Sequence, residues 1–537
     1  MRFTGACCVA LLFCVQIVFT QPGSASQAFS QAPARPATAN GSAQRPASPP
    51  PLETAEQKTA RLLDAAKSNG PALYAFLKQM PKGTDLHNHL SGAAYAESYA
   101  GFAAESHLCV EVRTMTLMPP PCKAGQLDAA QSLTDPVLYR QMIDAWSMRG
   151  WNHASESGHD HFFDAFTRFG EAVNGHSGEI LAEVVARAAD GKVQYLELMT
   201  APDGGKSIAL AAKIQWDEHF GHMRDKLLSS GISELVAESR RNLDAWEAER
   251  DRILNCRDQN KAMVRPGCQV TVRYIYPALR AVSPTQMFSQ MLLAFELTRQ
   301  DSRMVGVNMV QPEDWLVPMR DFRLHMRILS FLKELYPNVH VALHAGELAP
   351  GMVPPEGLRF HIRESVEVGH AERIGHGVDV MYEQDPHELL EEMARLNVMV
   401  EINLTSNSMI LGIRGRQHPL ADYLKAGVPV ALSTDDEGVE RSEITREYQR
   451  AVEDQGLDYL TLKKMVRTGM EHAFLPGQSL WADARKFVPV KECANERPVG
   501  RPSGAACQKF LSASEKARQQ WHLERSLADF ENSVSQR

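Results

Sequence analysis

Eight short, almost continuously apolar segments recur along the chain, separated by helix-prone or inserted sequence. Strands covered on both faces show such continuous hydrophobicity, and the helical sequence between them is typical of parallel crossovers. Eight strand-helix units predict an α/β fold, a (β/α)8 TIM barrel. The predicted strands are Thr84–His89, Val193–Met199, Gln269–Tyr276, Met304–Val310, Val339–His344, Arg373–His376, Val398–Asn403 and Val428–Thr434.

The sequence outside these strands predicts insertions and terminal helices. A helix-prone segment, 54–80, precedes the first strand, and three later segments exceed what a minimal barrel needs. These are 101–160, 216–267 and 488–508. We therefore expect a barrel domain at 54–487 and a C-terminal extension at 488–537. Within the extension, Ser512 and Glu515 stand in capping-box spacing, which predicts a terminal helix that packs on the barrel exterior.

The N-terminus has the features of a cleaved signal peptide. A short apolar run, Ala6–Phe19, follows Arg2, and small residues come next. A membrane anchor is disfavoured because about 20 apolar residues are needed to span. We assign 1–28 to the signal peptide and 29–53 to a disordered leader rich in Ala, Pro and Ser. These features predict a secreted or periplasmic protein with no membrane association after cleavage.

Cysteine usage agrees with export. Three of the nine cysteines fall inside the predicted signal, and the other six form three close pairs, which lie in the first insertion, at the end of the second and in the third. Many connectivities are possible, but local disulfides are favoured because short loops cost least to close. The alternative is six buried thiols. The local pairs are Cys109 with Cys122, Cys256 with Cys268, and Cys493 with Cys507.

Composition limits the class of partner. The chain has 537 residues, is 44% hydrophobic and carries a formal net charge of -8, with its basic residues scattered. An acidic balance repels phosphate backbones, so we expect no nucleic-acid partner. We therefore expect a small-molecule partner. The sequence does not determine the oligomeric state.

Residues suited to metal chemistry lie at the ends of four predicted strands. His87 and His89 alternate along the first strand, so their imidazoles point to the same side. Barrel enzymes keep their active sites at these carboxyl ends. Three histidines and an aspartate are typical of a zinc site that keeps an open position for water, whose pKa zinc lowers to about 7. The residues at the later strand ends are His344, Glu347, His376, Asp435 and Asp436.

Each of these residues has an ordinary structural explanation when taken alone. His344 or His376 fits a hydrogen-bonded core residue, Glu347 a solvated loop acid, and Asp435 a helix N-cap. Their joint occurrence at strand ends favours a shared site.

As a set, these motifs resemble the adenosine/AMP deaminase family. The resemblance runs from about residue 80 to 476, and the signal peptide and cysteine pairs are similar to those of exported members, including the deaminase-related growth factors. The matching motifs are Met80-Pro81-Lys82, His87-Asn88-His89-Leu90, His344-Ala345-Gly346-Glu347, Arg373-Ile374-Gly375-His376-Gly377 and Ser433-Thr434-Asp435-Asp436.

The resemblance implies a role for each matching residue. Glu347 would protonate the purine ring nitrogen beside the reacting carbon, His376 would orient and deprotonate the attacking water, and Asp436 would meet the imidazole side of the purine. The ligands of one zinc ion per chain would be His87, His89, His344 and Asp435. A bridged two-metal site would need a lysine on the fourth strand, Met304–Val310, which has none.

Two substrate contacts depart from the family pattern. Ser91 stands where the family commonly has the aspartate that holds the sugar hydroxyl, and Gln311 stands where a glycine is expected. Asn308 lies on the same strand-loop segment as Gln311 and is a candidate substrate contact. The aromatic residues of 146–169 are most simply core, and the alternative is that Phe162, Phe163 and Phe166 line a purine pocket.

The leading expectation is zinc-dependent deamination of adenosine or 2'-deoxyadenosine, by attack of metal-activated hydroxide at purine C6. One alternative is a modified adenosine, AMP or adenine as substrate, for which Ser91 and Gln311 are the reason. Another is a secreted nucleoside-binding or growth-factor-like protein. The complete set of acid, base and metal ligands argues against a mere binder.

Overall fold

The computed structural model of the chain describes residues 53–152, 154–498 and 500–536. The predicted signal peptide and nearly all of the predicted leader lie outside these residues. In the part of the chain that is described, no helix is both long and apolar enough to cross a membrane.

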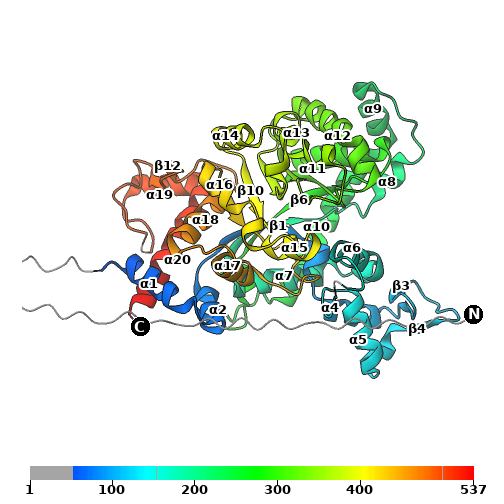
Figure 1. Ribbon diagram of the computed structural model, residues 1–537, viewed down its shortest axis with the longest axis horizontal. Coiled ribbons are helices and arrows are strands. Elements are labelled where there is room, and N and C mark those ends of the chain that lie inside the picture. Colours follow the sequence, from blue (N-terminus) through cyan, green and yellow to red (C-terminus); the bar gives the residue numbers. More distant parts are fainter. Residues whose placement is uncertain (1–52, 153, 499, 537) are drawn as a thin grey trace, which may run out of the picture. The chain divides into compact units, whose positions relative to one another are not determined.

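Eight parallel strands form the central sheet and confirm the predicted (β/α)8 barrel (Figure 1). They are β1 (Gly83–His89), β5 (Val193–Met199), β6 (Thr271–Leu279), β7 (Met304–Val310), β8 (His340–Ala345), β9 (Arg373–His376), β10 (Met399–Ile402) and β11 (Val430–Leu432). Neighbours in this order pair along the sheet, and a parallel bridge between Asn88 and Asp435 joins its two edges. The bridge brings the end of β1 against the segment after β11, where candidate site residues lie.

Helices form the crossovers between the strands. Their apolar faces cover the barrel, and the central part of α11 is buried almost all round, consistent with its weakly amphipathic sequence. The helices of the barrel are α7 (Ser177–Asp190), α10 (Ser233–Ile253), α11 (Pro284–Gln300), α12 (Leu316–Leu335), α13 (His361–Glu367), α14 (Pro386–Leu396), α15 (Leu404–Ile410), α16 (Leu420–Ala426), α17 (Ile444–Glu453) and α18 (Tyr459–His472).

The first insertion lies between β1 and α7. It contains a three-stranded antiparallel sheet in which β2 pairs with both β3 and β4, and helices flank this sheet. Its elements are α3 (Leu90–Ala93), α4 (Ala96–Glu105), β2 (Cys109–Glu111), β3 (Thr116–Met118), β4 (Gln126–Asp128), α5 (Pro136–Ala145) and α6 (Gly158–Phe169). Two helices, α8 (Lys206–Ala211) and α9 (Phe220–Leu227), precede α10 after β5.

The described ends of the chain pack together. The helix α20 lies beside α1 in Figure 1, and the rings of Phe76 and Phe530 meet edge to face at 5.5 Å. The elements concerned are α1 (Ala55–Ala66), α2 (Gly70–Gln79), β12 (Trp481–Asp483), β13 (Val488–Pro489), α19 (Ala505–Ala513) and α20 (Glu515–Ser535). The predicted start of the last helix was wrong: Ser512 lies inside α19, and Ser514 is the N-cap that accepts the Ala517 N–H.

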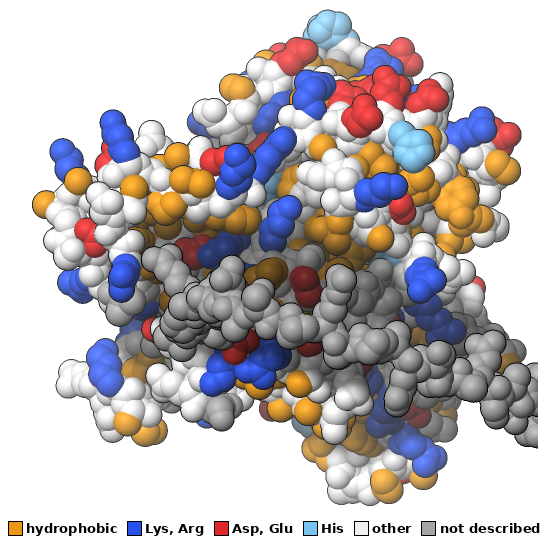
Figure 2. Space-filling model, turned by 60° about the vertical axis from the view of Figure 1, so that its left-hand side comes forward, with side chains coloured by type: hydrophobic (Ala, Val, Ile, Leu, Met, Phe, Trp, Pro, Cys, Tyr) orange, Lys and Arg blue, Asp and Glu red, His pale blue; other side chains and the backbone are white. Residues whose placement is uncertain are grey.

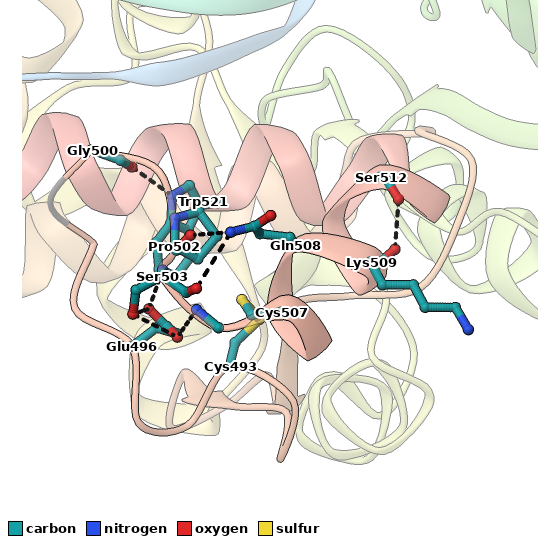
Figure 3. The surroundings of a disulfide bond; sticks show 11 residues. Cys493, Glu496, Gly500, Pro502, Ser503, Cys507, Gln508, Lys509, Ser512 and Trp521 are labelled. Carbon is teal, nitrogen blue, oxygen red and sulfur yellow. Dashed lines mark hydrogen bonds between the residues drawn. A yellow bond between two sulfur atoms is a disulfide. The ribbon is translucent and has the colours of Figure 1, made fainter.

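Disulfides close all three cysteine pairs in the local pattern that the sequence favours. Around Cys493–Cys507, the carboxylate of Glu496 accepts the backbone N–H groups of Ser503 at 2.8 Å and Gly504 at 2.7 Å (Figure 3). The indole of Trp521 donates to the Gly500 carbonyl, which fastens the loop to α20. On the face shown in Figure 2, acidic and basic side chains are interspersed with apolar ones.

Candidate active site

The candidate metal ligands come from three strand ends. His87 and His89 lie on β1, His344 lies on β8, and Asp435 follows β11. Asp435 has a positive φ of 59°, an uncommon conformation for a non-glycine residue that marks a constrained site. Its backbone N–H donates to the His87 carbonyl at 2.9 Å, so the bridge that closes the barrel also positions the carboxylate.

The spacing of these side chains fits a tetrahedral metal. His89 Nε2 lies 3.2 Å from His344 Nε2 and 3.2 Å from Asp435 Oδ1, and His87 Nε2 lies 3.4 Å from the same oxygen. Ligands about 2.0–2.1 Å from a tetrahedral zinc ion are separated by about 3.3 Å. Within the described residues, His87 Nε2 and Asp435 Oδ1 are buried and form no hydrogen bond. These four residues therefore fit a zinc ion as its ligands.

His376 shares this space from the end of β9. One ring nitrogen lies 3.7 Å from Asp435 Oδ2, which is longer than the other spacings, and the opposite one lies 2.9 Å from the Asn407 amide. His87, His344, His376 and Asp435 also form a group whose ligand atoms lie within 4.8 Å of one another. The distances favour His89 over His376 as the fourth ligand, and this assignment stays a prediction.

A buried polar network holds the ligands from behind. His87 donates from Nδ1 to Glu401 at 2.6 Å, and Arg373 bridges Glu401 at 2.7 Å and Glu197 at 2.6 Å. All four side chains are at most 1% exposed. This network was not predicted from the sequence, although Glu197 inside the apolar strand β5 and Glu401 inside the apolar strand β10 were visible signals.

Asn308, on β7, holds the His344 side chain in place. Its Oδ1 accepts from His344 Nδ1 at 2.9 Å and also from the His344 backbone N–H. Such partners fix the tautomer and orientation of a ligating histidine. Asn308 was a candidate substrate contact, but the structure places it behind His344 and outside the cavity lining.

Glu347 is buried beyond the end of β8. Burial and the nearby Asp435 carboxylate raise its pKa to about 8, so the carboxyl holds a proton at neutral pH. Its backbone N–H donates to Glu313 at 2.8 Å, and Glu313 is in turn paired with His361. This arrangement supplies a fixed proton donor.

Asp436 occupies space that a glycine leaves free. A Cβ at Gly92 would lie 1.6 Å from Asp436 Oδ1. Burial raises the pKa of Asp436 well above its ordinary value, and the adjacent Asp435 carboxylate adds to the shift. A protonated Asp436 can donate to a purine nitrogen, which accepts hydrogen bonds.

These groups face one cavity of about 280 Å³. Its inner wall includes His89, His344, Glu347, His376, Asp435 and Asp436. Ser91 and Gln311 also line it, and Gln311 has a positive φ of 87°, which explains why glycine suits that position. No lysine or arginine is among the lining residues that the structure describes.

An aromatic wall completes the cavity. Phe162, Phe163 and Phe166 line it from α6, and Trp315 lines it from the loop just before α12. Both expectations for these residues hold: the three phenylalanines line a pocket, and they also belong to the hydrophobic core or pack against it. Phe162 is buried as well as lining the cavity, so apolar pattern alone did not separate core from pocket.

Comparisons with known proteins cover the part of the chain that carries the later motifs, those of residues 344–347, 373–377 and 433–436. Residues 246–481 match the family model described as adenosine deaminase. Adenosine deaminase of Yersinia pseudotuberculosis is 34% identical over 156 residues, which are 28% of this chain and 43% of the relative. Aminodeoxyfutalosine deaminase of Streptomyces coelicolor is 33% identical over 156 residues, 28% of this chain and 38% of the relative. The matches thus span less than half the length of these curated relatives.

A solved structure extends the likeness over most of the chain. An amidohydrolase from Burkholderia ambifaria with bound Zn has a TM-score of 0.50 and 16% sequence identity, over 85% of this chain and 95% of that one. At 16% sequence identity, this likeness is evidence for a shared fold alone.

Proposed function

We propose that this chain, a member of the adenosine/AMP deaminase family, converts adenosine or 2'-deoxyadenosine to inosine or 2'-deoxyinosine with release of ammonia. The observation that carries the proposal is a cluster of four candidate metal ligands beside a protonated Glu347 and His376. Three of the four ligands, His89, His344 and Asp435, line the same cavity as Glu347 and His376. Candidate ligands at this spacing support one zinc ion per chain.

The chemistry requires a proton donor and a nucleophile on one carbon. A bound zinc ion supplies a Lewis acid that lowers the pKa of its water to about 7. Glu347 donates its proton to the adjacent ring nitrogen, which makes C6 electrophilic. Burial lowers the pKa of His376, so its imidazole is neutral at neutral pH and has an unprotonated nitrogen that can accept a proton from the attacking water. The water oxygen replaces the amino group. The proton that His376 takes from water passes to the amino group, which leaves as ammonia, and the remaining hydroxyl proton returns to Glu347 as the carbonyl of the product forms.

The cavity lining favours an uncharged substrate. No lysine or arginine side chain that the structure describes there can pair with a phosphate. We therefore expect adenosine to be a better substrate than AMP.

A direct test follows adenosine absorbance with purified, zinc-loaded protein, before and after treatment with a chelator. We expect turnover that the chelator abolishes and zinc restores. Failure of the zinc-loaded protein to deaminate any of adenosine, 2'-deoxyadenosine, AMP and adenine would refute the proposal.

A modified adenosine is a second candidate substrate. Ser91 and Gln311 line the cavity at positions where the sequence departs from the family pattern, and one relative is named for aminodeoxyfutalosine. A panel that includes 5'-modified adenosines distinguishes the two substrates. A nucleoside-binding or growth-factor-like role predicts instead that Glu347→Gln abolishes turnover and leaves the biological effect intact.

We also propose that the protein is exported. Three disulfides support this because they persist in oxidising compartments. N-terminal sequencing of protein recovered outside the cytoplasm tests the proposal, and an intact Met1 would contradict cleavage of a signal.

A further inference from the structure

The three phenylalanines of the aromatic wall belong to the insertion, whereas Trp315 belongs to the barrel loop before α12. On the insertion side, α6 is held by His161, which contacts Glu156 at 2.7 Å and the Ser147 carbonyl at 3.0 Å. Gly158 lets the start of α6 approach α15, because a Cβ there would lie 1.8 Å from the Met409 carbonyl oxygen. A further contact joins α6 to the loop between β7 and α12.

His159 makes that contact. Its Nε2 lies 3.0 Å from Asp314 Oδ1, on the loop between β7 and α12, and its Nδ1 lies 3.0 Å from Asp160 on the same helix. The side chains of His159 and Asp314 are 15% and 20% exposed, whereas that of Asp160 is 68% exposed. The link from α6 to the barrel loop is therefore the sheltered one of the two.

We propose that His159 and Asp314 form a clasp that holds the phenylalanine wall of α6 over the cavity and so strengthens substrate binding. Both are positioning residues, and the inference rests on the proposed function for its substrate. The clasp adjoins the cavity entrance: His159 packs edge to face on Phe163 at 4.9 Å between ring centres. Phe163 and Trp315 line both the cavity and a neighbouring outer cleft, so they stand where the cavity opens.

The charge state of His159 supports an ion pair. Burial lowers its pKa, but hydrogen bonds to Asp314 and Asp160 outweigh burial and raise the pKa to about 9. The ring is therefore charged at neutral pH. Asp314 follows Glu313, which accepts the backbone N–H of Glu347, so the clasp also touches the loop that supports the proton donor.

The two partners of His159 provide a matched pair of variants. Asp314→Asn removes the charged partner of His159 on the loop between β7 and α12, and Asp160→Asn removes its charged partner within α6. A partly sheltered ion pair is worth about 1 kcal/mol, so we expect KM for adenosine to rise about fivefold in Asp314→Asn and to stay within twofold in Asp160→Asn. We expect kcat to change less than KM in both. In a His159→Gln background, Asp314→Asn should have no further effect.

Hydrogen exchange tests the clasp without reference to turnover. Amide exchange in 158–169 should be faster in Asp314→Asn than in the parent protein, and no faster in the double variant than in His159→Gln. Equal KM changes in the two aspartate variants, or unchanged exchange in Asp314→Asn, would overturn the clasp. A protein that deaminates no 6-aminopurine but shows the expected exchange would refute the proposed function and leave the clasp standing.

Discussion

The partner of His87 offers a sharp test of how the metal site is held. Glu401→Gln keeps the size of the side chain but removes the charge that accepts the His87 Nδ1–H at 2.6 Å. Loss of such a partner typically lowers metal affinity about 10- to 100-fold, which corresponds to about 1.4–2.7 kcal/mol. We expect zinc affinity to fall by this amount.

The same substitution should destabilise the metal-free protein. Glu401 also pairs with Arg373 at 2.7 Å, and both side chains are at most 1% exposed. Removing one charge of a buried ion pair typically costs about 3–5 kcal/mol. Glu197 remains as a second partner of Arg373 at 2.6 Å, so we expect the lower end of this range.

A chromophoric zinc chelator in competition with the protein measures affinity, and chemical denaturation of the metal-free protein measures stability. Glu372→Gln is the matched control, because Glu372 holds His340 at 2.8 Å in a similar pair whose side chains are 41–42% exposed. We expect this control to bind zinc like the parent protein. Zinc affinity within twofold of the parent in Glu401→Gln would refute the assignment of His87 as a ligand held by Glu401.

Three further predictions concern single features. Glu347→Gln removes the proton donor, so it should lower kcat by about 10²–10⁴-fold and leave the zinc content unchanged. Steady-state kinetics and metal analysis check this. Full activity of the variant would contradict the role of Glu347 as proton donor. Lys82 is fully buried, and burial lowers its pKa from 10.5 to about 7. Between these two pH values the unfolded chain binds more protons than the folded protein, so the free energy of unfolding should rise with pH across this window. Chemical denaturation at pH 7 and pH 9 should show this rise in the parent protein and a smaller rise in Lys82→Met. At pH 7 the Lys82→Met protein should be the more stable of the two. Identical pH dependence in both proteins would contradict the lowered pKa of Lys82. Cys493→Ser with Cys507→Ser should cost about 3 kcal/mol by opening a loop with a sequence separation of 14, and denaturation that matches the parent would count against it.

Several local features were predictable because they depend on short stretches of sequence. Strands β5, β7 and β9 begin and end where the apolar pattern predicts. The alternation of His87 and His89 follows from the two-residue period of a strand, and the two side chains do approach the same carboxylate. The last helix shows the limit of such patterns, because Ser512 and Ser514 both precede Glu515 and only the packing of α19 decides which one is the cap.

The sequence by itself therefore determined the class of fold, the strand ends that carry chemistry and the cysteine pairs, since each depends on local periodicity or short loop closure. The tertiary structure decided which distant groups meet: Glu401 with His87, Asn308 with His344, and Asp314 with His159. These contacts depend on strand register, barrel closure and the docking of an insertion. Such relations are set by packing across the whole molecule, and no local pattern specifies them.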